Sequence, residues 1–480
     1  MTEADPLLDV INAYIGGDLN SALGLSQNLD AAGLRHPILS VLMAQSAFRI
    51  GRSDLAQGAL AQIEQFMQQD NARDVLTQFA RDMIVPETAN LYAAGDKAAV
   101  MGALDLSRLI LPDIAHAFPK DTAGLLAYQP AQKTPVPEPT PSLMTFAGPR
   151  SRPVAKDRRV LFLMRKFYLD SDSREHDMGP RMAAGFGFAD WHCRLADPTY
   201  NGREFQNAGA GDLFSLAQDH DAGIVIIDYC GLKLSPFALI EFINLCRRAR
   251  PDTKIVLIHL DAWQRDTWTL TVDMGARADL IWSLFPDLDI WQQPAIRDKM
   301  FFAPFMVGVK LDGMDHPMRS GRVAFHGAVE SYNATRSFWL TLLARSGYDI
   351  AIRRTGHGDD GLTPMDSYRR YLTGFLSDSA NLNFSARQDG SRIITGRTYE
   401  TIFAGACLIQ ERSADIDYYF EAGRHYLSFD TYEDLIDILA WLKREPDQAQ
   451  KIAAAGQAFY RQHYDDTAIV AALDARLFGD

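Results

Sequence analysis

The sequence predicts an α/β protein in which two Rossmann-like domains follow an all-α N-terminal region. Two changes of pattern along the chain support this fold class. The first ~125 residues are rich in Ala, Leu and Gln, with apolar residues at helical spacing. From Val160 onward, short β-rich runs alternate with helical stretches, and this alternation starts again near Arg322.

These patterns divide the chain into four segments. Residues 1–125 are expected to form the helical domain. Residues 126–156 are expected to form a linker, because residues 130–141 (PAQKTPVPEPTP) hold five prolines and favour an extended backbone. Residues 157–310 and 311–480 are then expected to form the two Rossmann-like domains. The length of 480 residues also favours several domains, because a single core stops growing at ~250–300 residues.

The helical segment contains a repeat. Four positions in the first copy recur 34 residues later with the same or a similar residue: Ala13 and Ala47, Tyr14 and Phe48, Gly17 and Gly51, Ala22 and Ala56. A period of 34 residues is typical of helix pairs that stack on one another, with a glycine ending the first helix. The segment therefore resembles a short tetratricopeptide array, with a third, degraded copy near Gly95. The alternative is a generic helical bundle.

The β-rich runs predict the strands of two parallel sheets. In the first block they are VLFLM (160–164), WHCRL (191–195), GIVIID (223–228), KIVLIHL (254–260), DLIWSLF (279–285) and MFFAPF (300–305). In the second they are RVAFHG (322–327), YDIAIRR (348–354), ANLNFS (380–385), ACLIQE (406–411) and HYLSF (425–429). Apolar runs separated by helices indicate strands that are buried on both faces. Ligands of such sheets bind at the carboxyl ends of the strands, so we expect a site between the two domains.

Composition excludes several classes of protein. Acidic residues outnumber basic ones by 61 to 48, a net charge of −13, which opposes binding to nucleic acid or anionic lipid. The four cysteines show no metal-binding spacing and are typical of a reducing compartment. The acidic N-terminus lacks the features of a signal peptide, and no apolar run approaches the ~20 residues of a membrane span. We therefore expect a soluble, cytoplasmic protein without a transmembrane segment or a nucleic-acid partner.

The stretch GRTYETIFAGACLIQE (396–411) is the most informative one chemically. A helix that begins near Arg397 presents free backbone N–H groups and about half a positive charge, which together favour an anion. The planar guanidinium of Arg397 suits diphosphate oxygens. Glu400, one turn along, is able to accept hydrogen bonds from two vicinal ribose hydroxyls. The alternative is that Glu400 only stabilises its own helix dipole and pairs with Arg397.

Residues about 320–470 resemble the C-terminal half of GT-B glycosyltransferases, in particular the glycosyl-transferase-like family related to spore-maturation proteins. The resemblance rests on a strand ending in Phe325-His326-Gly327, on Arg336 in the next helix, on the strand NLNFS, and on GRTYExxxAGACLI. It continues through the tail FEAGRHYLSFDTYEDLIDILAWLKREPDQAQKIAAAGQAFYRQHY (420–464).

The resemblance implies a set of donor-binding residues. Glu400 is expected to bind the donor ribose, Arg397 to lie near the diphosphate, and Gly327 to let the backbone approach the phosphates. Arg336 and Asn383 complete the expected donor set. Many retaining relatives carry a second glutamate eight positions before the first, but this chain has Arg392 there. Arg392 either helps to neutralise the leaving diphosphate or faces solvent, and the departure leaves a retaining or an inverting outcome open.

The resemblance also implies chemistry that needs no metal ion. The charge that grows on the leaving diphosphate would be met by arginines and a helix dipole, with Arg397 as a catalytic residue. DxD motifs, which bind metal in another glycosyltransferase class, occur at Asp170–Asp172, Asp287–Asp289 and Asp415–Asp417. Three such motifs in an acidic chain carry little weight, and two oxygen ligands do not make a metal site.

An inverting enzyme needs a general base from the first Rossmann-like domain. His176, in the polar loop after the first strand, has the side chain whose ordinary pKa lies nearest neutrality. Asp261 and Asp228 each follow a buried strand, where carboxylates commonly face a ligand. The alternatives are a solvated loop at residues 165–182 and helix N-caps at the two aspartates.

These observations together predict a metal-independent GT-B glycosyltransferase that moves a hexosyl or related sugar from a nucleotide-sugar donor to an acceptor. No cofactor is expected, and the nucleotide-sugar is a co-substrate. Stacked helix pairs offer a surface for peptides, so the acceptor is expected to be a protein bound by residues 1–125. The alternatives are a glycan or lipid-linked acceptor, or an inactive adaptor that binds sugar nucleotides.

Overall fold

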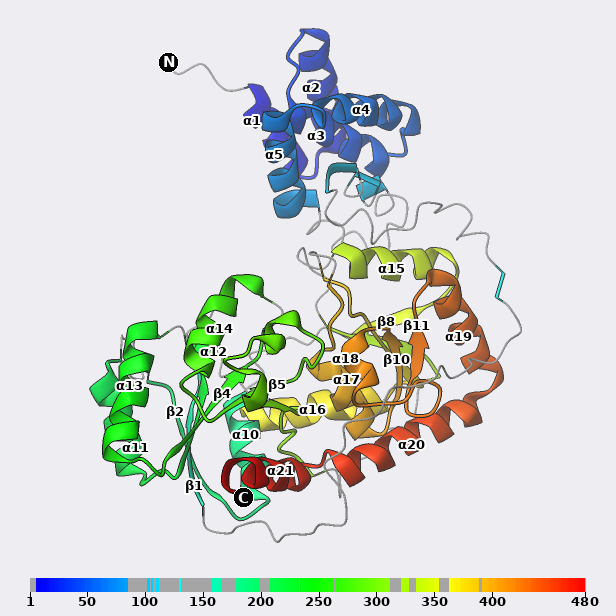
Figure 1. Ribbon diagram of the computed structural model, residues 1–480. Coiled ribbons are helices and arrows are strands. Elements are labelled where there is room, and N and C mark those ends of the chain that lie inside the picture. The colour runs from blue at the N-terminus through cyan, green and yellow to red at the C-terminus, as the bar shows by residue number, and fades with distance from the viewer. Residues whose placement is uncertain are drawn as a thin grey trace.

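The computed structural model confirms the predicted fold class, two parallel sheets preceded by a helical region (Figure 1). It describes residues 6–84, 102–103, 105–106, 109–111, 129–130, 158–165, 178–198, 208–232, 234–262, 264–310, 321–327, 334–353, 362–387 and 391–479. The predicted third helical copy near Gly95 and the proline-rich segment 131–141 lie outside these residues.

Consecutive N-terminal helices pack against one another. They are α1 (Pro6–Ile15), α2 (Leu19–Ala31), α3 (Pro37–Arg49), α4 (Ser53–Phe66) and α5 (Asp70–Phe79), followed by a π-helical turn at Ala80–Ile84. Gly17 and Gly51 adopt φ values of 80° and 76°, which glycine reaches without strain, and each ends the first helix of a pair. Ala22 and Ala56, also 34 residues apart, are fully buried. The described helices therefore carry the predicted spacing, and the tetratricopeptide-like assignment stays a prediction.

The first sheet has six strands in the order β2-β1-β3-β4-β5-β6, all paired in parallel. The strands are β1 (Arg159–Leu163), β2 (His192–Ala196), β3 (Ile224–Asp228), β4 (Lys254–His259), β5 (Leu280–Ser283) and β6 (Met300–Phe302). The helices are α10 (Met178–Gly187), α11 (Ala210–Asp219), α12 (Tyr229–Leu232), α13 (Pro236–Ala249) and α14 (Trp268–Gly275), with 3₁₀ turns at Arg265–Thr267, Asp289–Gln292 and Arg297–Lys299. Every residue of β3 is buried, as its unbroken apolar run predicts.

The second sheet has five strands in the order β11-β10-β9-β7-β8, again all parallel. The strands are β7 (Val323–His326), β8 (Ile350–Arg353), β9 (Ala380–Asn383), β10 (Cys407–Glu411) and β11 (Leu427–Phe429). The helices are α15 (Ala334–Arg345), α16 (Pro364–Leu376), α17 (Gly396–Ala404), α18 (Ala414–Asp417), α19 (Tyr432–Arg444), α20 (Pro446–His463) and α21 (Asp466–Phe478). Gly405, with a φ of 79°, ends α17 where the sequence predicts.

The last helix, α21, returns to the first sheet, which the strand pattern did not predict. Asp474 pairs with Arg158 at the start of β1, and Arg476 donates to the carbonyl oxygen of Asp298 at 3.1 Å. The carboxylate of Asp466 accepts the N–H groups of Val307 and Gly308, in the segment that leaves the first sheet. We call the described residues of 158–310, with the first sheet, the first half, and those of 321–479, with the second sheet, the second half. The two halves are joined by these polar contacts and by one apolar cluster that both share.

The helical region also packs against the second half of the protein, on the side of α15 (Figure 1). One cluster of buried apolar side chains includes Leu76 and Ile110 of the helical region together with Trp339 and Leu435 of the second half. Removing the helical region would therefore expose apolar surface. Within the described ranges, none of the helices combines the length and the apolar character needed to cross a membrane.

Candidate active site

Three of the predicted donor residues meet at the carboxyl end of the second sheet. Gly327 follows β7 directly, and a Cβ atom there would lie 2.4 Å from Nη1 of Arg397, so a side chain at this position would displace the guanidinium. The Nε–H of Arg397 donates to Oδ1 of Asn383, at the end of β9, over 3.2 Å. The sequence separates these residues by up to 70 positions, and the parallel sheet places them side by side.

Asn383 is buried and hydrogen-bonds to neighbouring side chains. It is 1% exposed, and its Nδ2 lies 3.1 Å from the hydroxyls of Thr395 and Thr398 and 2.8 Å from Oε1 of Gln410. These contacts tie the first turn of α17 to β9 and β10. Asn383 thus holds both the start of α17 and the guanidinium of Arg397, in a position that does not itself face solvent.

Arg336, on α15, also lies near this end of β7. Its guanidinium carbon is 5.2 Å from the ring centroid of Phe325, and that of Arg397 is 5.5 Å from the same ring. Arg336 is only 5% exposed. The structure therefore groups two guanidinium cations around Phe325, next to Gly327.

Glu400 is buried, at 4% exposure, and it contacts both halves of the protein. On α16, the Tyr368 hydroxyl donates to Oε1 over 2.9 Å and the Tyr371 hydroxyl donates to Oε2 over 3.2 Å. Arg181, on α10 of the first half, places Nη2 2.9 Å from Oε1. Burial, and then the charge of Glu400, raise the pKa of Tyr371 well above its ordinary value, so Tyr371 keeps its proton and donates.

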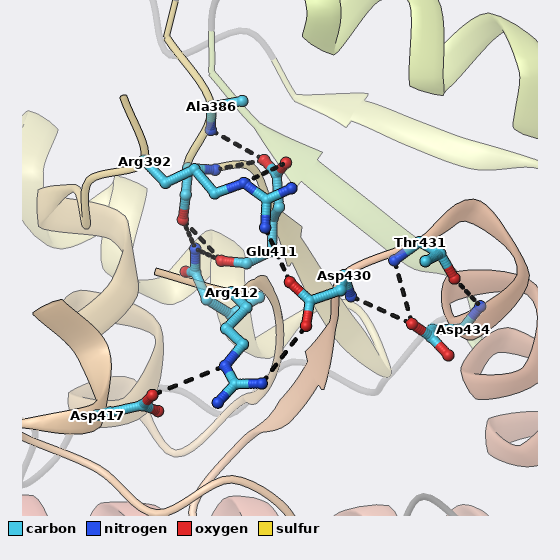
Figure 2. A network of polar contacts seen from close by, with 10 residues as sticks. Ala386, Arg392, Glu411, Arg412, Asp417, Asp430, Thr431 and Asp434 are labelled. Carbon is cyan, nitrogen blue, oxygen red and sulfur yellow. Dashed lines mark hydrogen bonds and ion pairs between the residues drawn. The ribbon is translucent and has the colours of Figure 1, made fainter. Parts of the chain in front are cut away.

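Arg392 belongs to a network of ion pairs at the ends of β10 and β11, between Glu411 and Asp430 (Figure 2). Its Nη1 lies 2.8 Å from Oδ1 of Asp430 and its Nε 3.9 Å from Oε1 of Glu411. Glu411 is buried and accepts the N–H groups of Ser385 and Ala386. Arg392 is partly exposed and has carboxylate partners, and a role toward a diphosphate stays a prediction.

Of the predicted general bases in the first half, the structure describes the two aspartates but not the histidine. His176 lies outside the described residues. Asp261 is exposed just after β4, beside Asp228 at the end of β3. Asp228 is 3% exposed and accepts the N–H of Gly231 over 2.8 Å. Burial raises the pKa of Asp228 to about 6, and the charge of Asp261 adds to this rise.

Two of the DxD motifs lie against each other between the halves. Oδ1 of Asp415 accepts the N–H of Asp287 over 3.0 Å, and burial raises the pKa of Asp415 to about 7. Among the described residues no group of three or more His, Cys, Asp or Glu side chains is arranged to hold a metal ion. The third motif, Asp170–Asp172, is outside those residues.

Sequence reasoning did not find Arg181, Tyr368 or Tyr371. The two tyrosines are three residues apart, which places them on one face of a helix, and this spacing was the available signal. Nothing in the sequence indicates that Arg181, 219 positions before Glu400, reaches the same carboxylate. That contact depends on how the two halves pack.

Comparison with protein families finds a match in the second half of the chain. A model described as glycosyl transferase-like matches residues 322–474. The matched segment contains the second sheet together with Gly327, Arg336, Asn383, Arg397 and Glu400. A search of curated proteins found no match.

Solved structures with similarity to this chain come from several organisms. A complex of the Anabaena protein HepE with UDP is 11% identical, with 66% of this chain and 98% of that chain covered and a TM-score of 0.44. A mutant of an O-GlcNAc transferase from Thermobaculum terrenum is 13% identical, with coverage of 99% and 97% and a TM-score of 0.41. Sucrose-phosphate synthase from Thermosynechococcus elongatus is 8% identical, with coverage of 66% and 97% and a TM-score of 0.43. The function proposed below rests on the family match and on the residues of the site.

Proposed function

We propose that the protein is a glycosyltransferase whose second half, residues 322–474, binds a nucleotide-sugar donor. The observation that carries this proposal is the agreement between the family match and the geometry. The matched segment brings Gly327 and Arg397 together where β7 and β9 end, next to the first turn of α17. Ligands of open α/β sheets bind at such strand ends.

In the proposed mechanism the donor diphosphate lies over the first turn of α17. The free N–H groups of that turn and the Arg397 guanidinium meet the negative charge that grows as the sugar–phosphate bond breaks. Asn383 holds Arg397 in place before the reaction, so little reorganisation is needed in the transition state. Gly327 leaves room for the phosphates to approach the backbone, and Glu400 receives the ribose.

On the acceptor side, a base from the first half would remove the proton of the attacking hydroxyl if the reaction inverts. Asp261 is the exposed candidate among the described residues, and His176 stays a second candidate. Asp228 is too buried to meet an acceptor, and we assign it to holding the turn at Gly231 behind Asp261.

The sugar transfer is proposed to be metal-independent, with the nucleotide-sugar as the co-substrate and no cofactor. The acceptor is proposed to be a protein held by residues 1–125. The repeated helix pairs α1–α2 and α3–α4 support this choice, because stacked pairs of helices present an extended surface. The relation to spore-maturation proteins also stays a proposal, supported by the sequence motifs alone.

Donor binding is tested by a thermal-shift screen of the full chain against UDP, GDP, CMP and dTDP. A nucleotide at 100 times its Kd stabilises a protein by ~2.7 kcal/mol, which shifts the melting temperature by a few degrees. We expect one nucleotide to stand out and its sugar conjugate to be hydrolysed slowly. Binding without hydrolysis or transfer would favour the inactive adaptor, and stabilisation by none of the four would contradict the proposal.

A further inference from the structure

The carboxylate of Glu400 is held by partners from both halves and keeps capacity for a ligand. A carboxylate offers about four acceptor positions, two on each oxygen. The Tyr368 hydroxyl takes one position on Oε1, at 2.9 Å, and the Tyr371 hydroxyl takes one on Oε2, at 3.2 Å. Nη2 of Arg181 lies 2.9 Å from Oε1, but this contact is an ion pair and not a hydrogen bond, so it fills no acceptor position. With these described partners in place, one position remains on each oxygen.

Next to the carboxylate of Glu400 there is a place where the chain has no side chain. Gly396 is the first residue of α17, and a Cβ atom there would lie 3.4 Å from both Oε1 and Oε2 of Glu400. Any larger residue at position 396 would therefore lie against the carboxylate. Gly396 belongs to the first turn of α17, where the proposed diphosphate binds. A ribose attached to that diphosphate would therefore lie near Glu400.

Arg181 comes from the other half of the protein. It lies on α10 and is 5% exposed, and its guanidinium carbon is 3.9 Å from the ring centroid of Tyr368. Its backbone is pressed against the segment that joins the halves, since a Cβ atom at Gly308 would lie 2.3 Å from the Arg181 carbonyl oxygen. Arg181 therefore reaches Glu400 only when the two halves are packed as they are here.

We propose that Arg181 is a positioning residue for donor binding, which fixes the carboxylate of Glu400 from the other half through their ion pair. Glu400 keeps one acceptor position on each oxygen for the hydroxyls of the ribose. The inference rests on the proposed function, because it takes the ligand at α17 to be a nucleotide. It also means that the donor site is completed by a residue outside 322–474.

The contact between Glu400 and the ribose is tested with deoxy analogues. The full chain is titrated calorimetrically with UDP and GDP, and the nucleotide that binds is compared with its 2′-deoxy and 3′-deoxy forms. We expect each analogue to bind about ten- to a hundredfold more weakly, the effect of losing one hydrogen bond to a charged group. Unchanged affinity for both analogues would overturn the contact between Glu400 and the ribose.

The role of Arg181 is tested by Arg181→Met and Arg181→Lys, with Arg158→Met as the matched control. Arg158 also forms an ion pair between the halves, with Asp474, and it also stacks on a ring, 3.7 Å from the centroid of Phe478. We expect Arg181→Met to weaken the nucleotide about tenfold or more, Arg181→Lys to restore part of the affinity, and Arg158→Met to have little effect. An equal loss in Arg158→Met would mean that the effect comes from the packing of the halves in general.

A double-mutant cycle separates positioning from a structural role. If Arg181 acts through Glu400, then Arg181→Met in the Glu400→Gln background should change the Kd by less than about threefold. If the two substitutions weakened nucleotide binding independently, so that their fold-changes in Kd multiplied in the double variant, the proposal would be overturned. Where Arg181→Met does not fold, Arg181→Lys takes its place in the cycle. A wild-type chain that binds neither UDP nor GDP, nor any other nucleoside diphosphate, would instead refute the proposed function itself.

Discussion

Replacing Gly327 with alanine tests the donor site at its most crowded point. The new Cβ would lie 2.4 Å from Nη1 of Arg397 and 3.1 Å from Cζ of Phe325, distances at which a neighbour has to move. The end of a long arginine side chain moves more easily than a packed ring does. We therefore expect the Arg397 guanidinium to leave its place between Gly327 and Asn383, with the rest of the fold retained.

The size of the effect follows from the contact that would be lost. A hydrogen bond between a guanidinium and a phosphate is worth ~1.5–3 kcal/mol, because one partner at least is charged. Its loss weakens binding by about ten- to a hundredfold. The free energy of unfolding is expected to fall by about 1–3 kcal/mol, the cost of placing a side chain on a backbone with a φ of 152°, a region that glycine alone adopts readily.

The assay is calorimetric titration of the nucleoside diphosphate that wild type binds, with Gly347→Ala as the control. Gly347 also has a positive φ, 83°, but a Cβ there would meet nothing within 4 Å. Both variants thus carry backbone strain, and only one displaces Arg397. A Kd for Gly327→Ala within about threefold of that for Gly347→Ala would refute the assignment of Gly327 and Arg397 to the diphosphate.

Three further predictions concern other parts of the protein. Turnover should survive EDTA, because arginines and a helix terminus are proposed to neutralise the leaving group; loss in EDTA with recovery in Mn²⁺ or Mg²⁺ would restore the DxD interpretation. Burial raises the pKa of Asp415 to about 7 from an ordinary 3.8, so folding favours its protonated form, and its contribution to stability is lost as the pH rises toward and through 7. Asp415→Asn should therefore reduce the loss of unfolding free energy between pH 5 and pH 8 in urea titrations, and an unchanged pH dependence would contradict this. Deleting residues 1–125 should lower thermal stability, because it exposes the apolar cluster shared with the second half. Slow donor hydrolysis should survive the deletion, whereas transfer to a protein acceptor should fall sharply. Equal transfer by the full and the truncated chain would reject recruitment by the helices.

The fold and half of the site follow from local sequence patterns. Buried parallel strands such as Ile224–Asp228 appear as unbroken apolar runs, and Gly405 ends α17 because glycine adopts a positive φ without strain. Arg397 was expected at an anion because it stands at a helix start, whereas Gly327 and Asn383 were implied by the family resemblance. Gly327 and Asn383 stand at strand ends, and a parallel sheet brings its strand ends to one edge.

The remainder depends on tertiary packing that local patterns do not encode. Arg181 reaches Glu400 only through the docking of two halves, and α21 returns to the first sheet through Asp466 and Asp474. Arg392 is expected at a diphosphate or in solvent, and the sequence did not indicate its bridge to Ala386 or its ion pairs with Glu411 and Asp430. These contacts join residues that are far apart in the sequence, and no local pattern around either residue indicates its partner.

The central claim is that residues 322–474 bind and activate a nucleotide-sugar. The most direct measurement is nucleotide release by the purified full chain from a panel of UDP-, GDP-, CMP- and dTDP-sugars, for wild type, Arg397→Ala and the control Arg444→Ala. Arg444 is an exposed arginine in the last turn of α19, so its loss removes the same charge away from the site. We predict release from at least one donor, reduced about tenfold or more by Arg397→Ala and unchanged by Arg444→Ala. Release from no donor, or equal release by all three proteins, would contradict the claim.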